Sequence, residues 1–340
     1  MSAAQSALDE KDVKGAFVRT GSTFRDVISA DHPTFKPEAG RYHLVVSHAC
    51  PWANRVVAVR ALKGLEDTIS LSVVHPTWQS TSQTDSHCGW AFEPSPGAAL
   101  KSPSGMGSFV VKDCAPLPGD VATGAASVRD VYAKCSTAST KFTVPFLWDR
   151  KTNTIVNNES SELIDMLNGA FDDFAANAGL DLDPAEFQAM RADMDPWIYN
   201  DVNNGVYRCG FAQTQEAYDE AVSSLYGALD RLEGMLATKR YLCGSTLTLS
   251  DVRLFMTLVR FDEVYVVYFK CNKKRIADYP HLRAYCRDVY QTPKMAGTIH
   301  MDHIKTHYFT SHPTLNHFAV IPAGPDVLAD LALPHGREAM

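Results

Sequence analysis

The stretch Cys50-Pro51-Trp52-Ala53 has the residue types for thiol chemistry. It lies where a β-like run at 42–47 gives way to a helical pattern at 53–62. Because proline is favoured at the first helical position, Pro51 predicts Cys50 at the helix N-cap. Backbone N–H groups and the helix dipole then favour the thiolate, the nucleophilic form of cysteine. Ala53 stands where a dithiol oxidoreductase carries its second cysteine, so a mixed disulfide on Cys50 must be resolved by an external thiol.

The composition narrows the class of protein. A chain of 340 residues predicts two domains, and a net charge of -7 gives no reason to expect nucleic acid or an anionic membrane as partner. No apolar run approaches the roughly 18 residues of a spanning helix, and the N-terminus lacks an apolar signal core. We therefore expect a soluble, cytoplasmic protein without a membrane partner. The eight cysteines include no Cys-x-x-Cys pair, which argues against a zinc knuckle or a disulfide scaffold.

The elements around the cysteine predict an α/β thioredoxin-like domain at 41–170, after a polar N-terminal extension at 1–40. Strand-like runs at 42–47, 68–74, 142–149 and 154–156 alternate with helical patterns at 53–62, 128–132 and 159–167. A long Ser-, Gly- and Pro-rich loop at 93–127 is either functional or an insertion. The Val144-Pro145 bond is a candidate cis peptide that presents its backbone to a ligand.

The second half of the chain predicts an all-α domain at 184–298. Residues 216–238 carry an amphipathic stripe, and Thr248 with Asp251 has the form of a capping box. The C-terminal extension at 299–340 is expected to be mostly irregular and solvated. His300, His303 and His307 recur there at helical spacing, but no carboxylate or cysteine completes a ligand set, so we expect no metal.

Several motifs resemble one family in order and spacing, from about residue 41 to Pro325. They are the segment 42–55, Val144-Pro145-Phe146-Leu147-Trp148-Asp149, Asn157-Asn158-Glu159-Ser160-Ser161-Glu162, Asn203-Asn204-Gly205-Val206-Tyr207, Arg260-Phe261-Asp262 and Phe269-Lys270-Cys271-Asn272. The family is the glutathionyl-hydroquinone reductases, the Xi class of glutathione transferases. The resemblance implies the glutathione transferase fold, glutathione as co-substrate, glutathionyl-hydroquinones as substrates and a homodimer. It also implies that Cys50 takes the glutathionyl group and a second glutathione releases it.

The resemblance assigns a set of glutathione contacts to this sequence. Glu159-Ser160 match the pair that binds the γ-glutamyl end, although both could simply cap a helix. Val144 matches the residue whose backbone pairs with the cysteinyl part. Trp90 matches a tryptophan near the glycyl end. Lys141 stands where the family often has arginine, so a two-point carboxylate contact becomes a single-point one.

Three tyrosines, expected from the helical part of the chain, match the family's quinone site. Tyr207 would exchange a proton with the ring oxygen, while Tyr265 and Tyr308 would donate hydrogen bonds near the sulfur and help keep Cys50 ionised. Without the resemblance all three would be read as interior tyrosines.

Other functions stay open on the residues alone. An omega-like transferase with thiol transferase or dehydroascorbate reductase activity would use the same cysteine. A conjugating transferase would need an activating Ser or Tyr, and a non-catalytic ligand carrier would need none of these side chains.

Overall fold

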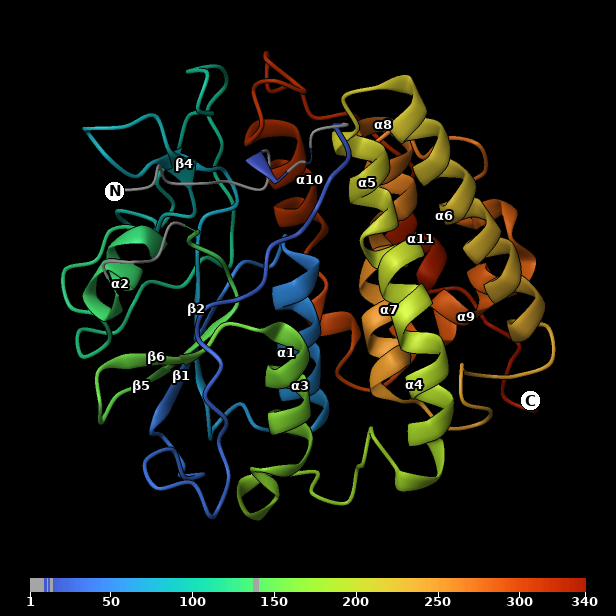
Figure 1. Ribbon diagram of the computed structural model, residues 1–340, viewed down its shortest axis with the longest axis horizontal. Helices are drawn as coiled ribbons and strands as arrows, with labels where there is room; N and C mark the ends of the chain where they lie inside the picture. The colour runs from blue at the N-terminus through green and yellow to red at the C-terminus, as the bar shows by residue number, and fades with distance from the viewer. Residues whose placement is uncertain (1–8, 11, 13–14, 137–140) are drawn as a thin grey trace. The chain divides into compact units, whose positions relative to one another are not determined.

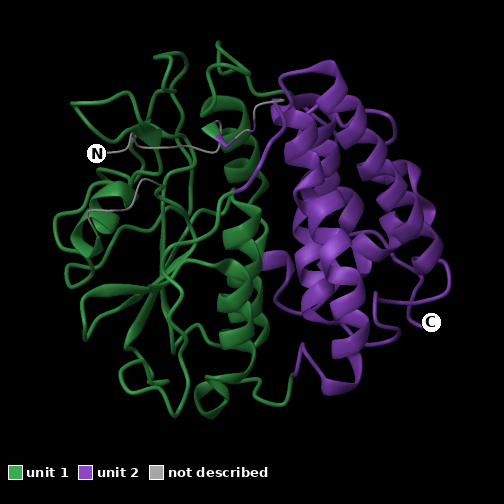
Figure 2. Ribbon diagram, in the orientation of Figure 1, with its two compact units in different colours: residues 1–9, 20–180, 298–322 green, residues 10–19, 181–297, 323–340 purple. Residues whose placement is uncertain are grey.

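The computed structural model describes residues 9–10, 12, 15–136 and 141–340, which form two compact units. The first unit contains Thr20–Leu180 and Thr298–Pro322, and the second contains Asp181–Gly297 and Ala323–Met340 (Figure 2). The N-terminal extension contributes to both, since the described residues of Glu10–Arg19 belong to the second unit. The rest of that extension, at 1–8, 11 and 13–14, lies outside the described residues.

A four-stranded sheet in the order β2-β1-β5-β6 is the centre of the first unit. The strands are β1 (Tyr42–Val46), β2 (Ser70–Val73), β5 (Phe146–Asp149) and β6 (Thr154–Asn157). β1 runs parallel to β2 and antiparallel to β5, and β5 runs antiparallel to β6. The alternation of strands and helices predicted from the sequence is confirmed, although the strands at 68–74 and 142–149 are shorter than predicted.

Helices cover both faces of this sheet. Figure 1 shows α1 (Pro51–Leu62) and α3 (Ser160–Gly169) on one face and α2 (Val128–Cys135) on the other. Every residue of α1 except Trp52 is buried, so this helix is a core element. Burying a valine side chain such as Val56 contributes roughly 1.5–3 kcal/mol, which holds the helix firmly against the sheet.

The long loop between β4 (Cys88–Gly89) and α2 is held by backbone bridges. Ala115 pairs with Val73 of β2, and Leu100 pairs with Phe109 within the loop. β4 itself pairs with β3 (Gln79–Ser80), and the short helix η2 (Asp172–Phe174) follows α3. The loop is therefore part of the first unit, and its residues 93–127 all fall in the described range.

The expectation of an irregular, solvated C-terminal extension is wrong for Met301–Thr310. These residues form α10, which belongs to the first unit. His303 is fully buried and His307 nearly so. Tyr308 therefore comes from the first unit and not from the helical part of the chain. Beyond α10, residues 311–326 contain no helix or strand, as expected.

The second unit is helical. Its elements are η3 (Ala185–Phe187), α4 (Gln188–Trp197), the π-helix η4 (Ile198–Asn203), α5 (Gly205–Phe211), α6 (Gln215–Leu236), α7 (Leu249–Arg260), the π-helix η5 (Phe261–Tyr265), α8 (Val266–Tyr268), η6 (Ile276–Asp278), α9 (Pro280–Gln291), η7 (Ala296–Thr298) at its boundary and α11 (Val327–Leu331). The predicted capping box is confirmed, because Asp251 Oδ2 accepts hydrogen bonds from the backbone N–H (2.8 Å) and the hydroxyl (2.9 Å) of Thr248.

Candidate active site

Cys50 is the N-cap of α1, with Pro51 in the first turn, as predicted. The backbone N–H of Cys50 donates to the Ser47 carbonyl oxygen (3.2 Å), and its carbonyl accepts from Asn54 N–H (2.8 Å). The residue is only partly buried. A sulfur at this position faces the N-terminal end of a helix, which stabilises negative charge. The arrangement suits a nucleophilic thiolate that a substrate can reach.

The strand entry at Val144-Pro145 lies beside this sulfur. The peptide bond is cis, as predicted, and Cys50 Sγ lies 3.6 Å from the Val144 carbonyl oxygen. Val144 is buried and directly precedes the cis bond, so its backbone adjoins the thiol. A ligand whose sulfur approaches Cys50 would meet the peptide groups of this segment.

Tyr132 of α2 fixes the segment that carries Val144. Its hydroxyl donates to the Thr143 carbonyl oxygen (2.9 Å) and accepts from Asn158 Nδ2 (2.9 Å). Burial raises the pKa of Tyr132 to about 12, so the hydroxyl remains a donor at neutral pH. Tyr132 thus helps to position Val144, which follows Thr143, and Glu159, which follows Asn158.

Glu159 and Ser160 open α3, where Glu159 is the N-cap. The capping interpretation is confirmed, because Glu159 Oε1 accepts a hydrogen bond from Ser161 N–H (3.1 Å). Arg55 of α1 reaches the same place: its Nη2 donates to Ser160 Oγ (2.6 Å) and lies 3.7 Å from Glu159 Oε1. A carboxylate, a hydroxyl, a guanidinium and a helix N-terminus therefore meet at one point, which suits a ligand carrying both an ammonium and a carboxylate.

Burial raises the pKa of the Glu159 carboxyl, but several groups lower it by more. Hydrogen bonds from the Ser161 backbone, Ser22 and the Ser161 hydroxyl, together with the charge of Arg55, hold this pKa below its ordinary value. Glu159 is therefore ionised at neutral pH and can receive a cation.

Trp90 lies in the first unit against α10. Its ring stacks on the His307 ring with centroids 4.4 Å apart, and His307 Nδ1 donates to the Pro76 carbonyl oxygen (2.9 Å). Tyr308, the next residue of α10, is almost fully buried. The structure thus brings the segment of Trp90 to the helix of Tyr308. On the same unit, Lys141 Nζ donates to Thr20 Oγ1 (3.2 Å).

The other two predicted tyrosines meet in the second unit. The rings of Tyr207 on α5 and Tyr265 at the end of η5 have centroids 6.2 Å apart. Phe269 stacks parallel on Tyr265 (5.3 Å) and packs on Tyr207 at the same distance. A side chain at Gly210 would place its Cβ 2.1 Å from Phe269, so glycine is required for this packing. Tyr265 is the last residue of a π-helical segment, η5, and Tyr207 lies in α5, the helix that follows the π-helical segment η4. Such segments are frequent at functional sites.

The histidines at helical spacing make ring and backbone contacts; His300 is the N-cap of α10, and His303 and His307 lie within the helix. The rings of His48 and His300 stack with centroids 3.8 Å apart, and His303 packs on His48 at 5.3 Å. Over residues 9–10, 12, 15–136 and 141–340 there is no group of three or more His, Cys, Asp or Glu side chains that could hold a metal ion. All eight cysteines are free thiols.

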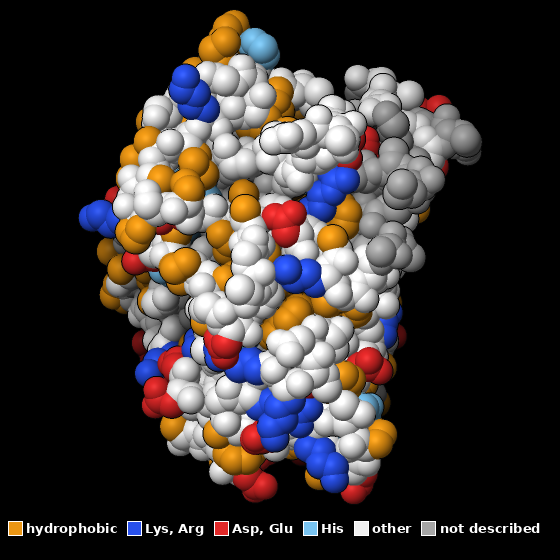
Figure 3. Space-filling model, turned by 90° about the vertical axis from the view of Figure 1, so that its left-hand side faces the viewer, with side chains coloured by type: hydrophobic (Ala, Val, Ile, Leu, Met, Phe, Trp, Pro, Cys, Tyr) orange, Lys and Arg blue, Asp and Glu red, His pale blue; other side chains and the backbone are white. Residues whose placement is uncertain are grey.

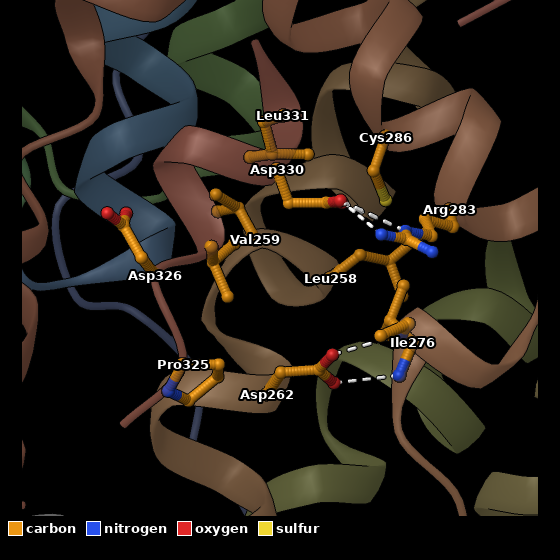
Figure 4. A pocket seen from close by; sticks show the side chains of 12 residues that line it. Leu258, Val259, Asp262, Ile276, Arg283, Cys286, Pro325, Asp326, Asp330 and Leu331 are labelled. Carbon is orange, nitrogen blue, oxygen red and sulfur yellow. Dashed lines mark hydrogen bonds and ion pairs between the residues drawn. The ribbon is translucent and has the colours of Figure 1, made fainter. Parts of the chain in front are cut away.

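A cavity of about 160 Å³ lies in the second unit among α7, α9 and α11 (Figure 4). Asp262 accepts hydrogen bonds from Ile276 N–H (2.7 Å) and Ala277 N–H (3.0 Å), and Asp330 pairs with Arg283. Its lining includes none of the predicted site residues, all of which the structure describes. Asp262 and Asp330 are therefore satisfied by their own neighbours.

Sequence reasoning missed three contributors to the site. Arg55 belongs to the motif at 42–55, and no function is predicted for it from the sequence. Its position about one turn after the N-cap cysteine is a local signal that could have identified it. Thr20 and Ser22 belong to the N-terminal extension, where Ser22 Oγ donates to Glu159 Oε2 (2.8 Å). No local pattern signals that contact, because it joins residues 137 positions apart.

Basic and acidic side chains are interspersed on the face shown in Figure 3. In the described part of the chain, no helix has both the length and the hydropathy to cross a membrane.

Comparison with known proteins gives matches along most of the chain. Residues 49–170 match the family described as glutathione S-transferase, N-terminal domain, and residues 215–288 match glutathione S-transferase, C-terminal domain. Glutathionyl-hydroquinone reductase YqjG of Escherichia coli is 45% identical, over 97% of this chain and 94% of the relative. Glutathionyl-hydroquinone reductase PcpF of Sphingobium chlorophenolicum is 43% identical, over 93% of this chain and 92% of the relative.

Solved structures agree with these matches. The Xi glutathione transferase of Phanerochaete chrysosporium superposes with a TM-score of 0.83 at 43% identity, covering 95% of this chain and 96% of its own. The glutathione-bound structure of YqjG gives a TM-score of 0.79 at 43% identity, covering 93% of this chain and 96% of its own.

Proposed function

The chain belongs to the glutathionyl-hydroquinone reductases, the Xi class of glutathione transferases, and we propose that it removes glutathione reductively from glutathionyl-hydroquinones. The products are the free hydroquinone and glutathione disulfide. Glutathione is the co-substrate. The observation that carries the proposal is the position of Cys50: an N-cap thiol 3.6 Å from the Val144 carbonyl, with Ala53 in place of a second cysteine.

In the first step, Cys50 thiolate attacks the glutathionyl sulfur of the conjugate. A disulfide forms between Cys50 and glutathione, the carbon–sulfur bond breaks, and its electron pair goes to the ring carbon, which takes up one proton. Tyr207 is the proposed partner of the ring oxygen during this change, while Tyr265 and Tyr308 hydrogen-bond near the sulfur. The ring is thereby reduced and leaves as a hydroquinone.

In the second step, the thiolate of another glutathione attacks the mixed disulfide. Glutathione disulfide forms, and the electron pair returns to Cys50 as thiolate. Ala53 leaves the chain without an adjacent thiol for this step. The external glutathione is therefore required in every cycle.

Binding of the glutathionyl group is proposed from the charges and contacts of the first unit. Glu159 takes the γ-glutamyl ammonium, and Ser160 with the N-terminus of α3 takes its carboxylate. The backbone at Val144 pairs with the cysteinyl part. Trp90 lies near the glycyl end, where Lys141 supplies a single-point contact with the carboxylate.

The test is turnover of a glutathionyl-hydroquinone, followed by release of hydroquinone, beside conjugation of a plain aryl chloride. We expect fast reduction of the first and little conjugation of the second. Incubation with glutathione disulfide should leave one glutathione on Cys50, seen by mass spectrometry. Efficient conjugation without any adduct would contradict the proposal, and reduction of dehydroascorbate without turnover of the conjugate would favour an omega-like activity.

The proposal includes a homodimer that works in the cytoplasm. A reducing compartment supplies the glutathione that each cycle consumes, and the eight free cysteines suit it. Analytical ultracentrifugation would measure the subunit number, and a monomer at micromolar concentration would contradict the dimer.

A further inference from the structure

The N-terminal segment 20–28 lies along the outer side of β6. Asp26 N–H donates to the Val156 carbonyl oxygen (3.1 Å), and Asn158 N–H donates to the Phe24 carbonyl oxygen (3.0 Å). Arg25 and Asn157 form an antiparallel bridge between these bonds. β6 leads directly into Glu159, so the segment is anchored by backbone bonds beside the start of α3.

Side chains of this segment contact two of the predicted glutathione-binding residues. Ser22 Oγ donates to Glu159 Oε2 (2.8 Å), and Thr20 Oγ1 accepts from Lys141 Nζ (3.2 Å). Thr20 and Ser22 are two residues apart, whereas Glu159 and Lys141 are assigned to opposite ends of glutathione. The segment therefore reaches both ends of the proposed binding site.

Glu159 is held at both carboxylate oxygens. Oε1 accepts from the backbone N–H (3.1 Å) and the hydroxyl (2.9 Å) of Ser161, while Oε2 accepts from Ser22. Hydrogen bonds to an ionised group are stronger than neutral ones and fix its direction. Ser161 belongs to α3 itself, so Ser22 is the contact to Oε2 that comes from a separate part of the chain.

We propose that Ser22 is a positioning residue for the γ-glutamyl end of glutathione, acting through Glu159. The inference rests on the proposed function for the identity of the ligand. Ser22 fixes the direction of the carboxylate that receives the γ-glutamyl ammonium, and the N-terminal segment is thereby a part of the substrate site. A ligand without the γ-glutamyl group gains nothing from Ser22.

The experiment measures binding of glutathione by calorimetry in the full chain carrying Cys50→Ser, where no disulfide can form at that position. Ser22→Ala is expected to weaken the binding of glutathione about 5- to 20-fold, because a hydrogen bond to a charged group is lost. Binding of cysteinylglycine, which lacks the γ-glutamyl group, is expected to stay unchanged. Ser22→Thr keeps the hydroxyl and should restore most of the affinity.

Two further variants separate positioning from general damage to the segment. Thr23→Ala changes an exposed neighbour on the same segment and should leave both affinities unchanged. In a Glu159→Gln background Ser22→Ala should have little further effect, because the two residues act as one unit. In the active enzyme Ser22→Ala should raise KM for the conjugate with kcat within about twofold.

An equal loss of affinity for glutathione and for cysteinylglycine in Ser22→Ala would overturn the inference. The inference would also be overturned if Ser22→Ala lowered the affinity for glutathione by the same factor in the Glu159→Gln background as in the Glu159 protein. These outcomes differ from failure of the proposed function. If the wild-type enzyme bound glutathione but failed to reduce the conjugate, the reaction would be wrong while the effect of Ser22 on binding could still be measured.

Discussion

Arg55 Nη2 donates a hydrogen bond of 2.6 Å to Ser160 Oγ, and this bond joins helix α1 to the start of α3. Cys50 begins α1 and Arg55 lies about one turn later. The distance from the nucleophile to the proposed γ-glutamyl site is therefore set by one helix and one guanidinium.

Arg55→Lys should raise KM for the conjugate about tenfold and leave kcat within about twofold, because a lysine cannot reproduce the fixed fork of a guanidinium at Ser160 and Glu159. Steady-state kinetics measures both constants. Arg60→Lys on the same helix is the matched control, since Arg60 Nε donates to the Ile69 carbonyl oxygen (2.6 Å), away from the site. A similar rise in KM for both variants would mean that Arg55 acts only through the stability of α1.

Cys50→Ser should lower turnover of the conjugate by at least about 1,000-fold with the fold intact, because only sulfur can form the mixed disulfide. Product release is followed by chromatography, and the fold by circular dichroism. Cys135→Ser, at the end of α2, should keep wild-type turnover. Near-normal activity of Cys50→Ser would rule out the mechanism given above.

Tyr207→Phe should slow reduction of the conjugate about 100-fold or more, because its hydroxyl is the proposed proton partner of the ring oxygen while the carbon–sulfur bond breaks and the ring carbon takes up a proton. Reduction of a mixed disulfide of glutathione with mercaptoethanol has no ring to protonate and should change less than about threefold. Tyr218→Phe is the control, since its hydroxyl donates to the Lys270 carbonyl oxygen (2.8 Å) on the same unit. Equal losses on the two substrates would exclude a role in protonation.

Asp251 should make stability depend on pH. Burial raises the pKa of its carboxyl from 3.8 to about 6, although hydrogen bonds from Leu242 and Thr248 oppose the rise. Between these two values the folded state binds more protons than the unfolded state, so the free energy of unfolding falls as pH rises and levels off above about 6. The expected fall is about 1 to 3 kcal/mol.

Urea unfolding at pH 4 to 8 measures this, with the difference between wild type and Asp251→Asn isolating the carboxyl. Asp193→Asn, at an exposed position, is the control: its free energy of unfolding plotted against pH should run parallel to that of wild type. A wild-type curve parallel to that of Asp251→Asn over the whole range would contradict the prediction.

Local signals were enough to predict much of the first unit and one helix start in the second. Pro51 after Cys50 predicted the N-cap, and Thr248 with Asp251 predicted a helix start, because both depend on residues within one turn. The cis bond at Val144-Pro145 was predicted from a proline at a strand entry. The order of strands and helices then predicted the thioredoxin-like arrangement.

The rest depends on contacts between distant segments, which no local pattern records. Arg55 and Ser160 are 105 positions apart, and Ser22 and Glu159 are 137 apart. The helix α10 was missed because histidines and, further on, prolines suggested an irregular tail, although Met301, Ile304 and Tyr308 recur there at steps of three and four. It is buried by the segments around Pro76 and Trp90, so tertiary packing overrides its weak local preference.

The two backbone pairings at the outer strands have a consequence for association. The bridge between Ala115 and Val73 covers part of β2, and the segment at Arg25 covers part of β6. Exposed strand edges act as templates on which other chains can add strands. The long loop and the N-terminal extension therefore prevent the strand of a neighbouring molecule from pairing with the sheet at these positions. They thereby reduce edge-to-edge aggregation at high protein concentration.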